Sequence, residues 1–154
     1  MDESSENSYL DETPESLLEQ AQYNAQAMML ATISVLDDLG VLTEAWADAV
    51  GERFALTWGS EDDWEAEEFL DAMMTNYRSL GATVVSVETD DDTATAVISG
   101  FPDEDLTETF GVAAADAAVF HRVAGAIAKS RGLSWTTELL DEGDLRFTVT
   151  SASD

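Results

Sequence analysis

The side chain with the widest chemical repertoire in this chain is its single histidine, His121, in the segment AVFHRVAG. An imidazole changes charge near neutral pH, so His121 is the natural candidate for a general base or a haem ligand. A lone histidine on an amphipathic helix is more often structural, and the sequence shows no second polar group that would assist it. We therefore assign His121 no ligating role. Two alternatives stay open: a small hydrolase-type enzyme that uses His121 or a buried carboxylate, and a haem-binding sensor through His121.

The residue pattern does not predict a metal site or a site that uses a thiol. The chain has no cysteine, which excludes disulfides, thiolate metal sites and cysteine nucleophiles. Carboxylate runs at 61–63, 90–92 and 103–105 offer oxygen ligands to hard cations. None has the spacing of a calcium loop, because the sixth place counted from Asp90 is Thr95, where such a loop needs glycine. We interpret these runs as solvated surface and expect neither a metal site nor a cofactor.

The net charge of the chain indicates the conditions in which the protein works. Thirty-three acidic residues stand against six basic ones, which gives a formal net charge of -27. We therefore expect a halophilic, haloarchaeal protein that works in a cytoplasm with molar salt. An acidic surface repels nucleic-acid phosphate and anionic lipid, so we expect no direct binding of nucleic acid or membrane. Four arginines could hold an anion, but we expect them to form surface pairs with carboxylates: Arg53, Arg78, Arg122 and Arg146.

One domain accounts for most of the chain. Its 154 residues are 45% hydrophobic, which is enough for one apolar core. Residues 1–12 are predicted to form a disordered acidic tail, and 13–150 a single α+β domain. The start is acidic and polar, unlike a secretory signal. The longest uncharged stretch, 20–36, carries too many polar side chains for a membrane span.

The spacing of apolar residues predicts helices, then strands, then a helix and further strands. Thr13-Pro14 is a typical helix start, and the apolar stripe that follows ends at Gly40. Gly51 in the second helix indicates a close helix crossing or a kink. The predicted order is ααα-ββ-α-ββ, with a roughly four-stranded antiparallel sheet covered by helices on one face. The expected helices cover 14–39, 43–58, 60–80 and 115–131, and the strands 83–88, 93–99, 133–140 and 145–150, paired as two hairpins.

The first predicted helix carries one apolar stripe whose members alternate at spacings of three and four residues. Such a stripe either packs inside the domain or faces a partner subunit. We expect a homodimer through this helical surface. The stripe consists of Leu18, Ala21, Ala25, Met28, Thr32, Val35 and Leu39.

Three segments in the second half of the chain follow one another in a recognisable order. The segment YRSLGATVVSVETDDDTATAVISGFP is followed by the helix VFHRVAGAIAKSRGLSW and the ending EGDLRFTVT. Over about residues 42–150, this order resembles a vinyl-reductase-type (4-vinyl reductase) small-molecule-binding domain. The family pattern is a helix ending at a glycine, a hairpin, a proline-bearing loop, a helix with an Ala-Gly pair, and a closing hairpin. The cysteines common near the family's last hairpin are missing. The tyrosine-serine-arginine haem motif of the nitric-oxide sensors related in fold is missing as well.

The resemblance implies a ligand site between sheet and helices. Its lining would include six residues that could equally be plain core: Trp46, Phe54, Tyr77, Phe120, Val123 and Trp135. We expect a non-catalytic ligand-binding or regulatory module that takes a small hydrophobic molecule or a regulatory protein partner.

Folding is expected to depend on salt. Spread over a sphere of about 19 Å radius, the charge of -27 gives a self-repulsion of roughly 25 kcal/mol at physiological ionic strength and about 10 kcal/mol at 1 M salt. The difference is comparable to the stability of a whole domain, about 5–15 kcal/mol. Circular dichroism should show cooperative structure in about 2–4 M KCl and a large loss near 0.1 M. Equal thermal midpoints at both salt concentrations would contradict this expectation.

Overall fold

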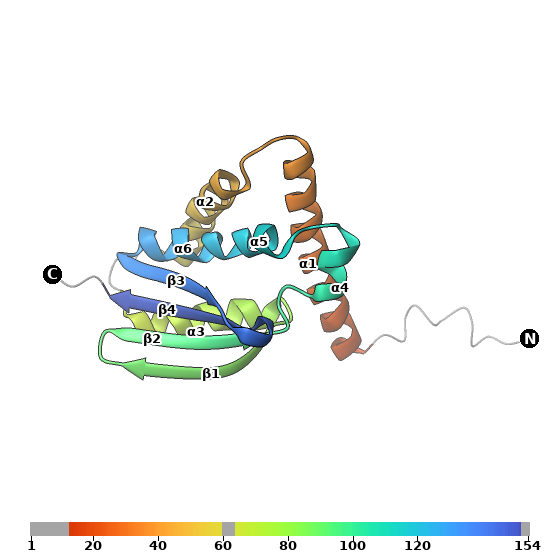
Figure 1. The fold of residues 1–154 in the computed structure, drawn as a ribbon. Coiled ribbons are helices and arrows are strands. Elements are labelled where there is room, and N and C mark those ends of the chain that lie inside the picture. The colour runs from red at the N-terminus through yellow and green to blue at the C-terminus, as the bar shows by residue number, and fades with distance from the viewer. Residues whose placement is uncertain (1–12, 60–63, 152–154) are drawn as a thin grey trace, which may run out of the picture.

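The computed structural model describes residues 13–59 and 64–151, and it folds them into helices packed on one antiparallel sheet (Figure 1). This α+β arrangement confirms the predicted fold class and the order of helices and hairpins. The predicted tail, 1–12, lies outside the described residues. The elements are α1 (Pro14–Asp38), α2 (Thr43–Phe54), α3 (Ala66–Ser79), β1 (Thr83–Asp90), β2 (Thr93–Ser99), α4 (Glu104–Thr109), α5 (Ala114–Ala117), α6 (His121–Ser130), β3 (Leu133–Leu139) and β4 (Leu145–Ser151).

Two hairpins lie side by side in the sheet. The strand order is β1-β2-β4-β3, and each neighbouring pair is antiparallel. Every second residue of a strand points to the same face, and in the two central strands that face is buried. The buried residues are Ala94, Ala96 and Ile98 in β2, and Leu145, Phe147 and Val149 in β4.

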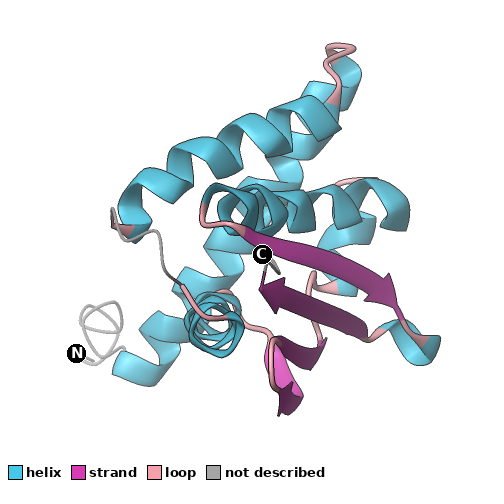
Figure 2. Ribbon diagram, turned by 90° about the vertical axis from the view of Figure 1, so that its left-hand side faces the viewer, coloured by secondary structure: helices cyan, strands magenta, loops and turns pink. Residues whose placement is uncertain are grey.

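Helices α3 and α6 cover the buried face, and the helices gather on one side of the sheet (Figure 2). α3 packs over β1, β2 and β4, whereas α6 packs over the edge strand β3. Their apolar faces supply most of the core: Phe69, Leu70, Met73, Met74 and Tyr77 from α3, and Val123, Ala124, Ile127 and Ala128 from α6.

Helix α2 crosses α6 at very short range. A Cβ atom at Gly51 would lie 2.5 Å from the Cβ of Ala126 and 2.6 Å from the carbonyl oxygen of Val123. Only glycine permits that approach, so Gly51 marks a close helix crossing. A second connection comes from Arg131, which follows α6 and donates hydrogen bonds to the carbonyl oxygens of Ala55, at 2.6 Å, and Gly59. These two residues bound the 3-10 helix Ala55–Trp58 that extends α2.

The segment between the two hairpins differs from the prediction. The helix expected over 115–131 is divided, because α5 ends at Ala117 and a 3-10 turn, Ala118–Phe120, precedes α6. Within the carboxylate run 103–105, Asp103 has a structural role: its Oδ1 accepts a hydrogen bond from the backbone N–H of Leu106 at 3.0 Å and caps the short helix α4. The run therefore contributes a helix start as well as exposed surface.

Two predicted helix details also change. In α2, Ala47 and Gly51 form the buried side, while Phe54, expected to line the ligand site, is 54% exposed. The third helix begins at Ala66; its expected start at Ser60 falls in 60–63, outside the described residues. The predicted start of α1 is confirmed, because Thr13 Oγ1 accepts a hydrogen bond from the backbone N–H of Ser16 at 3.1 Å.

Helix α1 stands at one end of the sheet beside α4 (Figure 1). Its inward side is formed by Gln26, Leu30 and Ile33. The Gln26 amide nitrogen donates to the Leu80 carbonyl oxygen at 2.6 Å, and its amide oxygen accepts from the Asp103 backbone N–H at 2.8 Å. α1 is thereby tied to both α3 and α4.

The predicted apolar stripe of α1 points away from the domain. Leu18, Met28, Val35 and Leu39 are all exposed, Met28 to 71%. These four side chains therefore do not pack inside the domain, which was one of the two possibilities that the sequence left open. Within 13–59 and 64–151, no helix has the length and apolarity that crossing a membrane requires.

Candidate binding cleft

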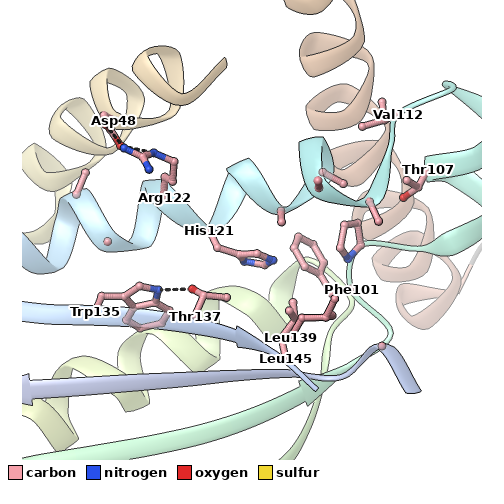
Figure 3. Close-up of a pocket in the computed structure, with 18 of the residues that line it drawn as sticks. Asp48, Phe101, Thr107, Val112, His121, Arg122, Trp135, Thr137, Leu139 and Leu145 are labelled. Atoms are coloured by element: carbon pink, nitrogen blue, oxygen red, sulfur yellow. Dashed lines mark hydrogen bonds and ion pairs between the residues drawn. The ribbon is translucent and has the colours of Figure 1, made fainter. Parts of the chain in front are cut away.

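A large open cleft lies between the helical segment α5–α6 and the β3–β4 hairpin (Figure 3). Its volume is about 1730 Å³, and its walls also include residues of α2 and α4. Pockets that hold small molecules usually measure roughly 300–1,000 Å³. The cleft can therefore contain such a molecule and still open to solvent.

Short side chains and a poorly covered strand create this space. Along β3, Leu133 is buried, Trp135 is half-buried and Leu139 is 69% exposed, so the cover of the strand decreases toward its end. The other wall is a helical segment whose side chains are too short to fill the gap. Its alanines that line the cleft are Ala114, Ala115, Ala117 and Ala118.

Trp135 lies where the cleft meets the core. Its ring stacks on Phe147 with the ring centroids 4.8 Å apart, and its indole N–H donates to Thr137 Oγ1 at 3.1 Å. Gly125 of α6 faces it, and a Cβ there would meet the Trp135 ring only at 3.6 Å, an ordinary contact distance. This part of the cleft is apolar, with its one indole donor already satisfied.

His121 lies in the cleft wall, at the first position of α6. Figure 3 shows its ring projecting from the helix toward Phe101, on the side of Leu145. His121 is 3% exposed, and its Nδ1 lies 2.7 Å from the phenolic oxygen of Tyr77 on α3, which is buried as well. Phe120 and Phe147 complete the aromatic surroundings of the imidazole.

This environment keeps both members of the pair neutral. Burial lowers the pKa of His121 to about 4 and raises the pKa of Tyr77 above its ordinary value. If the Tyr77 hydroxyl donates to Nδ1, the other ring nitrogen, Nε2, carries the imidazole hydrogen. Nε2 is buried, and no residue of the described part of the chain pairs with it.

Charged groups stand around the mouth of the cleft. Arg122 and Asp48 form two hydrogen bonds, from Nε to Oδ1 at 3.0 Å and from Nη2 to Oδ2 at 2.7 Å, between half-exposed side chains. The pair is an exposed ion pair of the kind predicted for the arginines, as is Arg146 with Glu138. The remaining charged residues that line the cleft are Glu52, Glu104, Glu108 and Lys129.

The structure distributes the six predicted pocket residues over different environments. Trp135 lines the cleft. Tyr77 and Val123 are buried in the core, and Tyr77 reaches the site only through its hydrogen bond to His121. Trp46 and Phe120 are half-buried and pack against the core, whereas Phe54 is exposed. Apart from Trp135, none of the six predicted residues lines the cleft.

Several cleft residues were not singled out by the sequence. Phe101, Leu139 and Leu145 are apolar residues of loop and strand with no distinguishing motif. The five alanines within 113–118 were the available signal, because a helix without large side chains leaves room beside it. His121 was noticed, but its partner Tyr77 is 44 positions away in the sequence.

The carboxylates do not form a second chemical site among the described residues. The buried polar side chains there are Gln26 and His121, so none of the described carboxylates is buried. In the same part of the chain, no three histidine or carboxylate side chains gather as metal ligands would.

Comparisons with protein-family models, with curated proteins and with solved structures found no match for this chain.

His121 should make the stability depend on pH in a specific window. The unfolded imidazole has a pKa of about 6.5, whereas the folded one has a pKa of about 4, so the unfolded state binds more protons between these values. The contribution of His121 to the free energy of unfolding is therefore complete above pH 6.5. It decreases as the pH falls toward 4, by about 3 kcal/mol in total.

A double variant, Tyr77→Phe with His121→Phe, isolates this effect. It removes the titrating ring and leaves no unpaired phenol, while every carboxylate is retained. Guanidinium unfolding in about 3 M KCl between pH 7.5 and 4.5 should show the loss in the wild-type protein relative to the variant. Parallel pH profiles of the two proteins would show that the histidine is not held neutral by burial.

Proposed function

We propose that this protein is a non-catalytic ligand-binding or regulatory module that takes a small hydrophobic molecule into the cleft beside His121. The cleft supports this proposal because it is large, opens to solvent and is bounded mainly by apolar side chains. Large apolar concavities with few convergent polar groups are the usual form of small-molecule sites. The acidic composition supports a cytoplasm with molar salt as the setting.

The surroundings of His121 favour binding over catalysis. Nδ1 is engaged by the Tyr77 hydroxyl, and the ring is enclosed by aromatic side chains. A hydrolase would need a nucleophile or an activated water within hydrogen-bond reach of the imidazole. Haem ligation through Nε2 would require Nδ1 to carry the hydrogen, which would leave the buried phenolic hydrogen of Tyr77 without its acceptor.

A regulatory role is supported by the position of α1. This helix packs on both α4 and α5, which also contribute residues to the cleft. A ligand that prefers one arrangement of α4 and α5 would therefore shift the arrangement of α1 by its difference in affinity for the two states.

The partner that we propose for α1 is a second copy of the chain. The exposed stripe repeats every 3.5 residues, which is the spacing of a coiled-coil seam. The stretch 20–36 of α1 carries no charge, although the chain as a whole carries -27. Two copies of the chain would repel each other least where neither carries acidic side chains. A basic partner protein would instead bind an acidic face. Antiparallel pairing about Met28 would superpose the two uncharged stretches.

Ligand binding can be tested with Nile red, a neutral lipophilic dye whose fluorescence rises in apolar surroundings. In about 3 M KCl, saturable binding with a higher melting temperature is expected, because the dye binds only the folded state. Ala118→Trp should weaken binding about ten-fold or more, since the indole fills the cleft. Ala45→Trp, at an exposed alanine of α2 outside the cleft, is the matched control.

Three results would contradict this function. Equal loss in both tryptophan variants would place the dye elsewhere. A Soret band on adding haem that disappears in His121→Ala would support the haem sensor, and ester hydrolysis that disappears in the same variant would support the hydrolase.

Self-association is tested separately by light scattering in about 3 M KCl. The expected mass is about twice the 16.6 kDa of the chain. Met28→Glu should give the monomer mass, because it places a charge in the middle of the seam. Leu56→Glu adds the same charge at an exposed apolar residue outside α1 and should remain dimeric. A wild-type protein that stays monomeric at tens of micromolar would rule out the proposed pairing.

A further inference from the structure

The buried pair Tyr77–His121 can be hydrogen-bonded in two directions, and these differ in what they leave unpaired. If Tyr77 donates to Nδ1, the one hydrogen left without an acceptor is that on Nε2. If Nδ1–H donates to the Tyr77 oxygen, the phenolic hydrogen and the Nε2 lone pair both lack partners. Because burying an unpaired polar group is costly, the first direction is favoured. The pair therefore presents an N–H donor at Nε2.

The histidine belongs to the wall of the cleft, and its Nε2 is buried there. His121 is among the lining residues, and its ring is otherwise surrounded by Phe101, Phe120, Phe147 and Tyr77. None of these phenylalanines offers an acceptor to Nε2. The described residues leave three buried nitrogens unpaired, in Trp64, His121 and Arg131, and of these residues only His121 lines the cleft. An oxygen atom brought by a ligand would satisfy His121 Nε2.

The charges around the cleft restrict the ligand further. Of its two cationic residues, Arg122 is neutralised by Asp48, which leaves Lys129 against Glu52, Glu104 and Glu108. The chain as a whole is strongly negative. An anionic ligand would be repelled by this field, and a cationic group placed against the Nε2 hydrogen would face a positive dipole.

We propose, resting on the function proposed above, that the cleft selects uncharged apolar molecules that carry one carbonyl or hydroxyl oxygen, and that this oxygen accepts a hydrogen bond from His121 Nε2. Tyr77 is the positioning residue that holds the hydrogen on that nitrogen. Hydrocarbons of the same shape lack the acceptor, and carboxylates of the same shape are excluded by charge.

Three probes of nearly equal size separate the effect of the acceptor oxygen from the effect of charge: acetophenone, cumene and benzoate. In cumene, a methyl group replaces the carbonyl oxygen of acetophenone. Their affinities in about 3 M KCl are measured by displacement of Nile red from tag-free protein. Acetophenone should bind and benzoate should not. The ratio of acetophenone to cumene affinity should fall about three- to ten-fold in the double variant Tyr77→Phe/His121→Phe, as expected for one lost hydrogen bond. Thr137→Val removes another polar group of the cleft and frees the Trp135 indole N–H, so this variant should not lower the ratio.

The wild-type protein provides a second measurement that needs no variant. His121 is the sole histidine, so the ring nitrogens give a single set of NMR signals in uniformly labelled protein. The Nε2 resonance and its attached hydrogen should shift on adding acetophenone and remain in place with cumene.

The outcomes separate this inference from the function on which it rests. If none of the probes displaces Nile red and the dye itself does not bind, the binding function fails. If acetophenone and cumene bind but their ratio is the same in both proteins, the role of His121 is overturned while the binding function stands. Loss of the ratio in Thr137→Val alone would assign the polar contact to Thr137, and tight binding of benzoate would overturn the selection for uncharged molecules.

Discussion

The close crossing of α2 and α6 at Gly51 is the contact on which the arrangement of the cleft depends. It allows the backbones to approach without an intervening side chain, and Arg131, directly after α6, donates to two carbonyl oxygens that follow the C-terminal end of α2. α6 is thereby held between α2 and β3. Since His121 is the first residue of α6, the crossing also fixes where the imidazole meets Tyr77.

The elements that the sequence predicted are those whose signal is local. Thr13 and Pro14 are adjacent and mark a helix start by their own chemistry, and the alternation of buried residues in β2 is written into TATAVIS. The site depends on contacts between residues far apart in the sequence, which no local pattern predicts. In the sequence, Tyr77 is one more residue on the apolar face of α3, and only the fold places it beside His121. Phe54 is exposed at the last position of α2, although it was predicted to line the ligand site. Apart from the exposed Phe54, the six predicted residues belong to the core or pack against it, and only Trp135 also lines the cleft.

The acidic composition and the buried polar groups divide the molecule into two electrostatic regions. The carboxylates of the described residues remain outside the core, where salt can screen them, whereas Gln26, Tyr77 and His121 are neutral polar side chains buried inside. Gln26 satisfies both ends of its amide with backbone groups. His121 satisfies one nitrogen within the described residues and leaves the other in the wall of the cleft. Trp64 and Arg131 each contain a further buried nitrogen without a partner among the described residues, but of the three residues only His121 lines the cleft.

The alanine-rich wall gives this cleft an unusual capacity for evolutionary change. Ala114, Ala115 and Ala118 are exposed, so enlarging any of them alters the cleft without disturbing the packed core. Substitutions at such positions usually change stability by no more than about 0.5 kcal/mol. Related chains could therefore acquire different ligand preferences by single replacements along this wall, while the Tyr77–His121 pair and the crossing at Gly51 stay the same.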